Sequence, residues 1–131
     1  MNSEETSIES EESFFFDSYA FFEILKGNKN YENYKKFKIV TTKLNIFELY
    51  LGLLRGIDEE VAKKYLEKYY PFVIEFGKNT IEEAAKLKNK LNKRDISMTD
   101  CIGYVLSQQI GIKFLTGDKE FKNFDNVEFI E

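Results

Sequence analysis

The feature that most limits the possible folds of this chain is a regular alternation between short apolar runs and longer stretches of helical periodicity, which begins at Phe14. Strands separated by helices are typical of βαβ units, in which helices cover both faces of a parallel sheet. The apolar runs predict strands at residues 14–16, 38–41, 72–75, 113–115 and 127–130. The expected fold class is therefore α/β: a three-layer α/β/α open sheet of about five mainly parallel strands, of Rossmann-like type.

The helices between these strands are bounded by residues that begin or end helices. Gly27 and Gly111 each follow a periodic stretch, as glycines at helix C-termini do. Asp58 is a good N-cap, and Pro71 prevents the helix that follows Asp58 from continuing. Helices are therefore expected at residues 18–26, 31–35, 44–55, 59–70, 80–91 and 99–110, with a helical turn at 118–121.

Charged residues are distributed unevenly along the chain. The first 13 residues hold five Glu and no Lys or Arg, and Ile8 is their one large aliphatic residue. Such a segment cannot bury enough apolar surface to offset the entropy lost on ordering, so we expect a disordered acidic tail at residues 1–13. Residues 14–131 suffice for one well-filled core and are too few for two ordinary domains, so a single domain is expected there.

Two absences in the composition narrow the chemistry. The chain has no histidine, and Cys101 is its single cysteine. This excludes hydrolase mechanisms that use imidazole, an internal disulfide and a thiolate zinc site, so carboxylates must carry any acid chemistry. No apolar run approaches the roughly 20 residues that span a bilayer, and the N-terminus is acidic. These features favour a soluble protein of the reducing cytoplasm.

Four acidic residues stand where an open α/β sheet places its chemistry. Asp17 directly follows the first predicted strand, and Asp118 follows the fourth in Thr116-Gly117-Asp118. Ligands of such sheets bind at the carboxyl ends of strands, and a parallel topology brings these two ends side by side. Asp100 begins the last long helix, and Glu48 lies inside an apolar helix, where a carboxylate is costly unless it is paired or bound to a metal. One shared metal site accounts for all four.

The surroundings of Asp100 and Glu48 are predicted from helical periodicity. Asp100 shares its side of the helix with three residues: Gly103, Tyr104 and Ser107. This side is expected to be polar and locally narrow, and to form the wall of a cleft. The opposite side is expected to face the core: Cys101, Ile102, Val105 and Leu106. Glu48 is expected beside an apolar stripe: Leu44, Phe47, Leu51 and Leu54.

Each acid also has a purely structural explanation. Asp17 and Asp118 are in positions suited to helix N-caps. Asp100, in the first turn of a helix, complements the helix dipole. Glu48 has Arg55 or a lysine available as a buried ion-pair partner. These four explanations are separate from one another, and the sequence leaves them open.

Three segments carry a resemblance to a known family: FFFDSYAFFEIL around Asp17, TTKLNIFELYLGL around Glu48, and ISMTDCIGYVLSQQIGIKFLTGDKEFKNFDNVEFI, which includes Asp100 and Asp118. The third is the most specific, with an acid that opens a helix, a glycine after that helix, a short strand and the Thr-x-Asp triplet. The chain resembles the PIN domains, and among them the small VapC-type ribonuclease toxins. The resemblance covers residues 14–130, so residues 14–131 are expected to be one PIN-like nuclease domain.

This resemblance implies a function and a site. PIN domains are metal-dependent nucleases whose conserved acids match Asp17, Glu48, Asp100 and Asp118, while Thr116 matches a hydroxyl beside the site. It implies an endoribonuclease that hydrolyses RNA to 5′-phosphate and 3′-hydroxyl products, with a small antitoxin as partner and with dimers usual among similar proteins. Clustered carboxylates without His or Cys favour Mg²⁺ or Mn²⁺. Asp17 and Asp100 are expected as the central ligands, with Asp118 and Glu48 completing the site.

Further residues are candidates for holding RNA or supporting the site. Lys86, Lys90 and Lys93 are expected to share one helical face and, with Arg94, to form a basic rim for RNA. The alternative is an ordinary solvated helix surface. Ser18 is expected either to steady a metal-bound water or, as the favoured interpretation, to cap its helix.

Other functions compete with the toxin. A housekeeping RNA-processing nuclease and a catalytically inactive PIN-like binding module share the same fold. A receiver-type signalling domain also gathers acids around Mg²⁺, and Glu75 would be its acid after the predicted strand at residues 72–74. The acidic tail would serve, in one alternative, as a decoy that lies over a basic cleft and competes with RNA.

Overall fold

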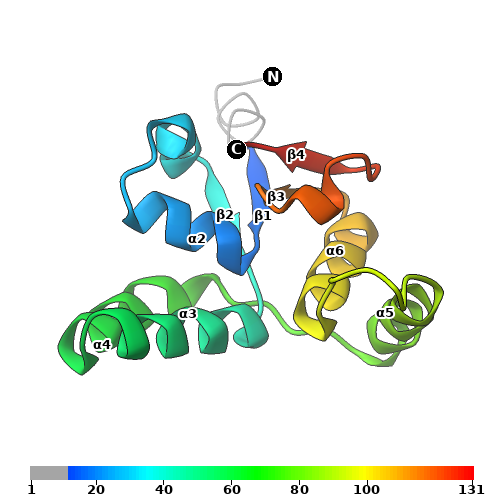
Figure 1. Cartoon of the computed structure of the whole chain (residues 1–131), viewed down its shortest axis with the longest axis horizontal. Coiled ribbons are helices and arrows are strands. Elements are labelled where there is room, and N and C mark those ends of the chain that lie inside the picture. Colours follow the sequence, from blue (N-terminus) through cyan, green and yellow to red (C-terminus); the bar gives the residue numbers. More distant parts are fainter. Residues whose placement is uncertain (1–11) are drawn as a thin grey trace, which may run out of the picture.

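Four parallel strands form the sheet in the computed structural model, which describes residues 12–131 (Figure 1). They are β1 (Ser13–Phe16), β2 (Lys38–Val40), β3 (Lys113–Thr116) and β4 (Val127–Phe129), in the order β2-β1-β3-β4. Strand β1 starts one residue before the predicted position, at Ser13. Residues 1–11 of the predicted tail lie outside the described residues. The parallel α/β prediction is confirmed.

The third predicted strand, at residues 72–75, is wrong. Only Val73 pairs, in an isolated parallel bridge to Thr41. The chain before it forms a 3-10 turn, η2 (Tyr70–Phe72), which contains Pro71. Thr41 lies just beyond the end of β2, so the pairing with Val73 has no further β2 residues along which to continue. Apolar residues in this segment were therefore mistaken for a buried strand.

The helices lie where the sequence pattern predicts them. They are α2 (Ser18–Leu25), the 3-10 helix η1 (Lys29–Lys36), α3 (Lys43–Gly56), α4 (Glu59–Tyr69), α5 (Lys78–Lys90), α6 (Met98–Ile110) and the short turn η3 (Lys119–Phe121). Gly27 and Gly111 adopt φ angles of 81° and 78°, the left-handed conformation that ends helices and that glycine adopts without strain. None of the helices in residues 12–131 has the length and apolar character to cross a membrane.

Helices cover both faces of the sheet, as Figure 1 shows with α2, α3 and α4 on one side and α5 and α6 on the other. Alternate residues of β1 point to opposite faces: Phe14 and Phe16 pack with the first group of helices, and Phe15 packs with the second. Burying each phenylalanine contributes roughly 1.5–3 kcal/mol to folding. The apolar run of β1 thus holds both outer layers on the sheet, and the three-layer prediction is confirmed.

The predicted cleft wall on α6 is wrong. Gly103, Tyr104 and Ser107 are buried, as is the side of the helix predicted to face the core. A Cβ atom at Gly103 would lie 2.8 Å from the Phe15 ring, and the Tyr104 hydroxyl donates to the Asp125 carbonyl at 2.7 Å. Helix α6 is covered on several sides because it lies between the sheet, α5 and the segment before β4.

The predicted apolar stripe of α3 is also misplaced. Phe47 is 65% exposed and Leu54 is 40% exposed, whereas the buried residues of the helix are Asn45, Ile46, Leu49 and Leu53. Because α3 is apolar almost all round, its periodicity did not identify the buried face.

Candidate metal centre

Asp17 stands at the point where β1 ends and α2 begins. Its Oδ1 accepts a hydrogen bond from the Ala20 N–H at 2.8 Å, which makes it the N-cap of α2. The residue is 2% exposed, and this burial raises the pKa of its carboxyl group to about 8. Hydrogen bonds from the Thr116 side chain and the Ala20 N–H act in the opposite direction. The site therefore has at its centre a carboxyl group that is costly to ionise without a cation.

Thr116 connects Asp17 to Asp118. It ends β3, the strand next to β1, and its side chain lies near enough to the Asp17 carboxyl group to lower the pKa of that group. The Thr116 hydroxyl also accepts a hydrogen bond from the Asp118 N–H at 3.0 Å. Asp118 caps the short turn η3, where its Oδ1 accepts from the Glu120 N–H at 3.0 Å. Two neighbouring strand ends thus present their aspartates side by side, as the sequence pattern predicts.

Asp100 enters the site from the N-terminus of α6. It forms a capping box with Ser97, in which each side chain accepts a hydrogen bond from the other residue's backbone N–H. Burial raises the pKa of Asp100, and the nearby negative charges of Asp118 and Glu48 raise it further, while the Ser97 hydrogen bonds lower it. Ser97 was not identified from the sequence, although a serine three residues before an acid is a capping-box signal.

Glu48 is held by a chain of hydrogen bonds. The Ser18 hydroxyl donates to Glu48 Oε1 at 2.6 Å, and Asn45 Nδ2 donates to the Ser18 hydroxyl at 3.2 Å. The Thr42 hydroxyl in turn donates to Asn45 Oδ1 at 2.6 Å. Asn45 is 1% exposed and was missed by the sequence reasoning. Its signal was a polar residue one turn before Glu48 in an otherwise apolar helix.

The structural explanations of the acids are partly correct. Asp17 and Asp118 are N-caps, and Asp100 belongs to a capping box. The alternative explanation of Glu48, an ion pair with Arg55 or a lysine, does not hold, because Glu48 makes no salt bridge within residues 12–131. Ser18 is not a helix cap, because Asp17 occupies that position. Capping alone leaves unexplained why Asp100 and Asp118 lie near enough to Asp17 for their charges to raise its pKa.

The four acids influence one another electrostatically. The charges of Asp100 and Asp118 raise the pKa of Asp17, and those of Asp118 and Glu48 raise the pKa of Asp100. In the part of the chain that the structure describes, none of the four forms an ion pair with Lys or Arg. Asp17 is buried and the other three acids are half-buried, so mutual repulsion without a positive partner is unfavourable there. A divalent cation would remove this repulsion.

The donor set fits such a cation, although the side chains are not drawn together around one point. Within residues 12–131, no three acidic side chains are close enough to hold a metal ion as they stand. Each acid accepts a hydrogen bond on one carboxylate oxygen: Asp17 from the Ala20 N–H, Glu48 from the Ser18 hydroxyl, Asp100 from the Ser97 N–H and Asp118 from the Glu120 N–H. Carboxylate oxygens without His or Cys match the preference of Mg²⁺ and Mn²⁺, which keep several waters and so need few direct ligands.

The basic residues predicted to hold RNA are dispersed. Arg94 donates from Nε to Glu120 Oε1 at 2.9 Å and lies over the Phe124 ring, so it is bound next to the turn that carries Asp118. Lys86 and Lys90 lie together on α5, but Lys93 does not share their helical face, because α5 ends at Lys90. Lys86 pairs with Glu83 at 3.4 Å. The single basic rim expected from the sequence is therefore divided into two parts.

Glu75 does not lie at an acidic site. It is exposed and pairs with Lys43 at 3.3 Å, and the strand expected before it is absent from the described sheet. The receiver-type alternative requires an acid at the end of a middle strand. It is therefore not supported by this fold.

Comparison with known proteins identifies the fold independently. The family model described as PIN domain matches residues 14–127. The VapC20 toxin of Mycobacterium tuberculosis, described as cleaving the sarcin–ricin loop, superposes with a TM-score of 0.74 at 16% identity, over 90% of this chain and 99% of that one. VapBC2 from Rickettsia felis, bound to a DNA fragment from its promoter, gives 0.69 at 17% identity, over 91% and 99%.

A toxin-antitoxin complex from Klebsiella pneumoniae gives a TM-score of 0.67 at 16% identity, over 87% of this chain and 94% of that one. No curated protein sequence matches the chain. At identities this low, the superpositions show a shared fold alone. The match to the family model extends over most of the chain.

Proposed function

Because this chain belongs to the PIN domain family, we propose that it is a divalent-metal-dependent endoribonuclease that hydrolyses RNA phosphodiester bonds. The observation that carries the proposal is the electrostatic coupling of Asp17 with Asp100 and Asp118 at the carboxyl ends of β1 and β3. These carboxyl groups make no ion pair in residues 12–131, and they come from three separate parts of the chain. Stability alone would favour apolar or paired side chains there.

Each residue of the site has a role in this proposal. Asp17 and Asp100 would hold Mg²⁺ or Mn²⁺, with Asp118 and Glu48 completing the site partly through water. When bound, the cation supplies Lewis acidity, which activates water and offsets negative charge on the phosphate. Thr116 would support the site by accepting a hydrogen bond from the Asp118 backbone N–H beside Asp17.

Glu48 is oriented by hydrogen bonds from a second group of residues. Ser18 donates to its carboxylate, and Asn45 holds the Ser18 hydroxyl in place. Groups of this kind determine how well ligands are aimed, and their loss commonly weakens metal binding. Ser18 therefore supports the site as a hydrogen-bond donor to an acid.

We further propose that the enzyme acts as the toxin of a toxin-antitoxin pair in the cytoplasm. Two structures with the same fold are described as a toxin-antitoxin complex and as a toxin, which supports this proposal. The free, buried Cys101 fits a reducing compartment. A small antitoxin would then be the protein partner, and RNA the substrate. A housekeeping RNA-processing enzyme is distinguished by growth: only a toxin should arrest growth when expressed alone and be relieved by a neighbouring small gene product.

The test of the chemistry is an RNA cleavage assay on the purified full chain. Structured and unstructured RNAs are incubated with Mn²⁺, with Mg²⁺ or with EDTA. We expect cleavage with either ion, none with EDTA, and loss of cleavage in Asp17→Asn and Asp100→Asn. Asp58→Asn is the matched control, because Asp58 is also an N-cap aspartate but lies exposed at the start of α4.

Circular dichroism must show that all the variants fold, which the retained capping ability of Asn favours. The proposal fails if both Asp17→Asn and Asp100→Asn cut RNA as well as the parent. It also fails if EDTA leaves cleavage unchanged, since the acids would then have no cation-dependent role. A folded chain that binds RNA but does not cut it under any ion condition would favour the inactive binding module.

A further inference from the structure

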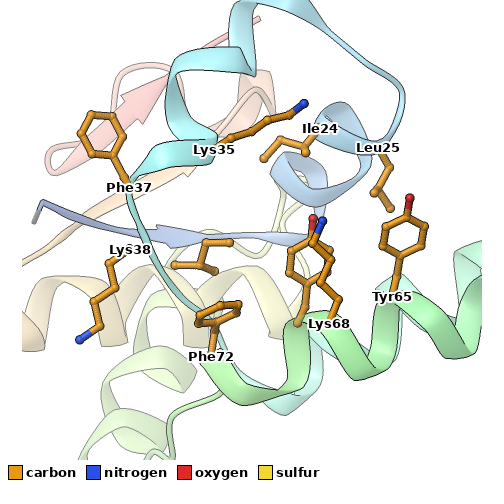
Figure 2. Close-up of a pocket in the computed structure, with 10 residues that line it drawn as sticks. Ile24, Leu25, Lys35, Phe37, Lys38, Tyr65, Lys68 and Phe72 are labelled. Atoms are coloured by element: carbon orange, nitrogen blue, oxygen red, sulfur yellow. The ribbon is translucent and has the colours of Figure 1, made fainter.

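A groove away from the acidic site combines lysines with aromatic side chains. It has a volume of about 390 Å³ and lies between α2, the end of η1, β2 and α4. Figure 2 shows Lys35, Lys38 and Lys68 around it, with Phe37, Tyr65 and Phe72 among its walls. None of its lining residues is acidic. The groove is therefore a local positive surface with an apolar floor.

The lysines of the groove are largely available to a negative partner. Lys35 pairs with the exposed Glu32 at 2.7 Å, whereas Lys38 and Lys68 make no salt bridge within residues 12–131. The Lys68 ammonium lies 5.3 Å from the centre of the Tyr69 ring and 5.9 Å from that of Tyr65. It is thus held at the groove by rings and not by a carboxylate.

Negative charge that could complement the lysines of the groove is concentrated at the start of the sequence. Residues 1–11 contain four Glu and no Lys or Arg, and the whole chain has 23 acidic and 19 basic residues. Residues 12–131 therefore hold 19 acids and 19 bases, so their formal net charge is zero and the whole net charge of −4 belongs to the first 11 residues. An acidic segment and a lysine-rich groove without acids are complementary.

The attachment point of that segment lies at the groove. The Lys38 backbone N–H donates to the Glu12 carbonyl at 2.9 Å, and Ser13 pairs with Lys38 in the sheet. Residues 1–11 therefore join the described chain beside one of the groove's own lysines. Ile8 is four residues before Glu12, a span of at most about 14 Å in extended chain. This reach allows Ile8 to meet the apolar floor while the neighbouring glutamates meet the lysines.

We propose that this groove is a docking surface for an acidic peptide, and that its occupant is residues 1–11 of the same chain. Ile8 enters between the aromatic side chains, and the glutamates around it approach Lys38 and Lys68. Covalent attachment favours this occupant, because a short tether gives an effective concentration on the order of millimolar. The inference does not depend on the proposed nuclease function.

RNA is a less suitable occupant of this groove. Ile24 and Leu25, which line it, are at the C-terminal end of α2, whereas Asp17 caps the other end. The eight residues of α2 separate the two places by about 12 Å along the helix axis. A strand of RNA bound in the groove would need a further path to reach the acids. The peptide needs only its own attachment.

The test uses a nitroxide spin label on the full chain. Ser7→Cys supplies the label position, and Cys101, which is 1% exposed, is protected from labelling. Amide signals of Tyr65 and Tyr69, on the α4 side of the groove, are expected to be lost in the NMR spectrum when the nitroxide is oxidised and to return when it is reduced. Raising the salt to about 1 M, where the Debye length is about 3 Å, should restore part of this intensity.

Matched charge changes separate this contact from general attraction. Lys38→Gln with Lys68→Gln should restore the lost signals, while Lys63→Gln with Lys86→Gln, at exposed positions outside the groove, should leave them lost. The Lys38 backbone hydrogen bond is kept in both. Glu4, Glu5, Glu9 and Glu11 changed together to Gln should act as the groove variants do.

Four results would overturn the proposal. One is full signal at the groove with the oxidised label. Another is signal loss that appears only when labelled chains are mixed with separate isotope-enriched chains, which would make a second copy the occupant. The third is equal restoration by both lysine pairs, which would reduce the effect to net charge. An RNA oligonucleotide that shifts the groove signals of the parent without displacing the label would also contradict it.

Discussion

Replacing Asp17 by Asn should stabilise the metal-free protein, and the gain should increase with pH. Burial raises the pKa of Asp17 from 3.8 to about 8. Between these two pH values the native state holds a proton that the unfolded chain has released. Stability therefore falls as pH rises through this window, because the unfolded state binds fewer protons. An asparagine at this position has no proton to lose and avoids this penalty.

The size of the effect follows from the two pKa values. At about 1.4 kcal/mol per pH unit, a pKa change from 3.8 to about 8 corresponds to about 6 kcal/mol at alkaline pH. At pH 7 the corresponding penalty is about 4 kcal/mol, and from pH 5 to pH 8 it grows by about 4 kcal/mol. Asn keeps an amide oxygen to accept from the Ala20 N–H, so the cap of α2 survives.

The assay is urea unfolding followed by circular dichroism in EDTA at pH 5, 7 and 8.5. The difference in free energy of unfolding between Asp17→Asn and the parent should widen across this series, while Asp58→Asn should remain close to the parent throughout. Adding Mg²⁺ at pH 8 should stabilise the parent and have little effect on Asp17→Asn. A difference that is independent of pH, or that shrinks as pH rises, would refute the reasoning.

Two further predictions concern groups that support the site and the core. Asn45→Ala removes the amide that donates to the Ser18 hydroxyl, so it should lower the free energy of unfolding in urea by roughly 1–3 kcal/mol. It should also raise the Mn²⁺ concentration for half-maximal cleavage by about tenfold or more, and an unchanged Mn²⁺ dependence would contradict this. Gly103→Ala should destabilise by roughly 1–3 kcal/mol in the same unfolding assay, since its Cβ would lie 2.8 Å from the Phe15 ring, whereas Gly56→Ala, with nothing within 4 Å, should not.

Sequence reasoning succeeded where one local signal matched the tertiary outcome. The Phe14–Phe16 run is a strand because its residues are buried on both faces, and Gly111 ends α6 in the left-handed conformation that it favours. It failed where the outcome depends on partners far away in the chain. Val73 has β-favouring neighbours but only Thr41 to pair with, so the segment is not a strand.

The candidate metal centre shows the same difference between features set by local sequence and features set by distant partners. The placement of Asp17 and Asp118 followed from strand ends in a parallel sheet, which is a rule of topology. The role of Asn45 did not follow, because its hydrogen bond to Ser18 joins two helices that are separate in sequence. Nor did the sequence distinguish caps from candidate ligands, since the same aspartates cap helices and lie at the candidate site. The raised pKa values of Asp17 and Asp100 arise only from the packed surroundings.

That two of the acids are helix N-caps has an evolutionary consequence. In Asp17 and Asp118, the oxygen that starts a helix or turn belongs to the same side chain that supplies negative charge. Asparagine starts a helix about as well as aspartate, so one substitution removes the charge and leaves the architecture standing. A gene with this layout is a single step from encoding an intact but silent protein, and descendants that have exchanged cutting for binding are within easy reach of neutral drift.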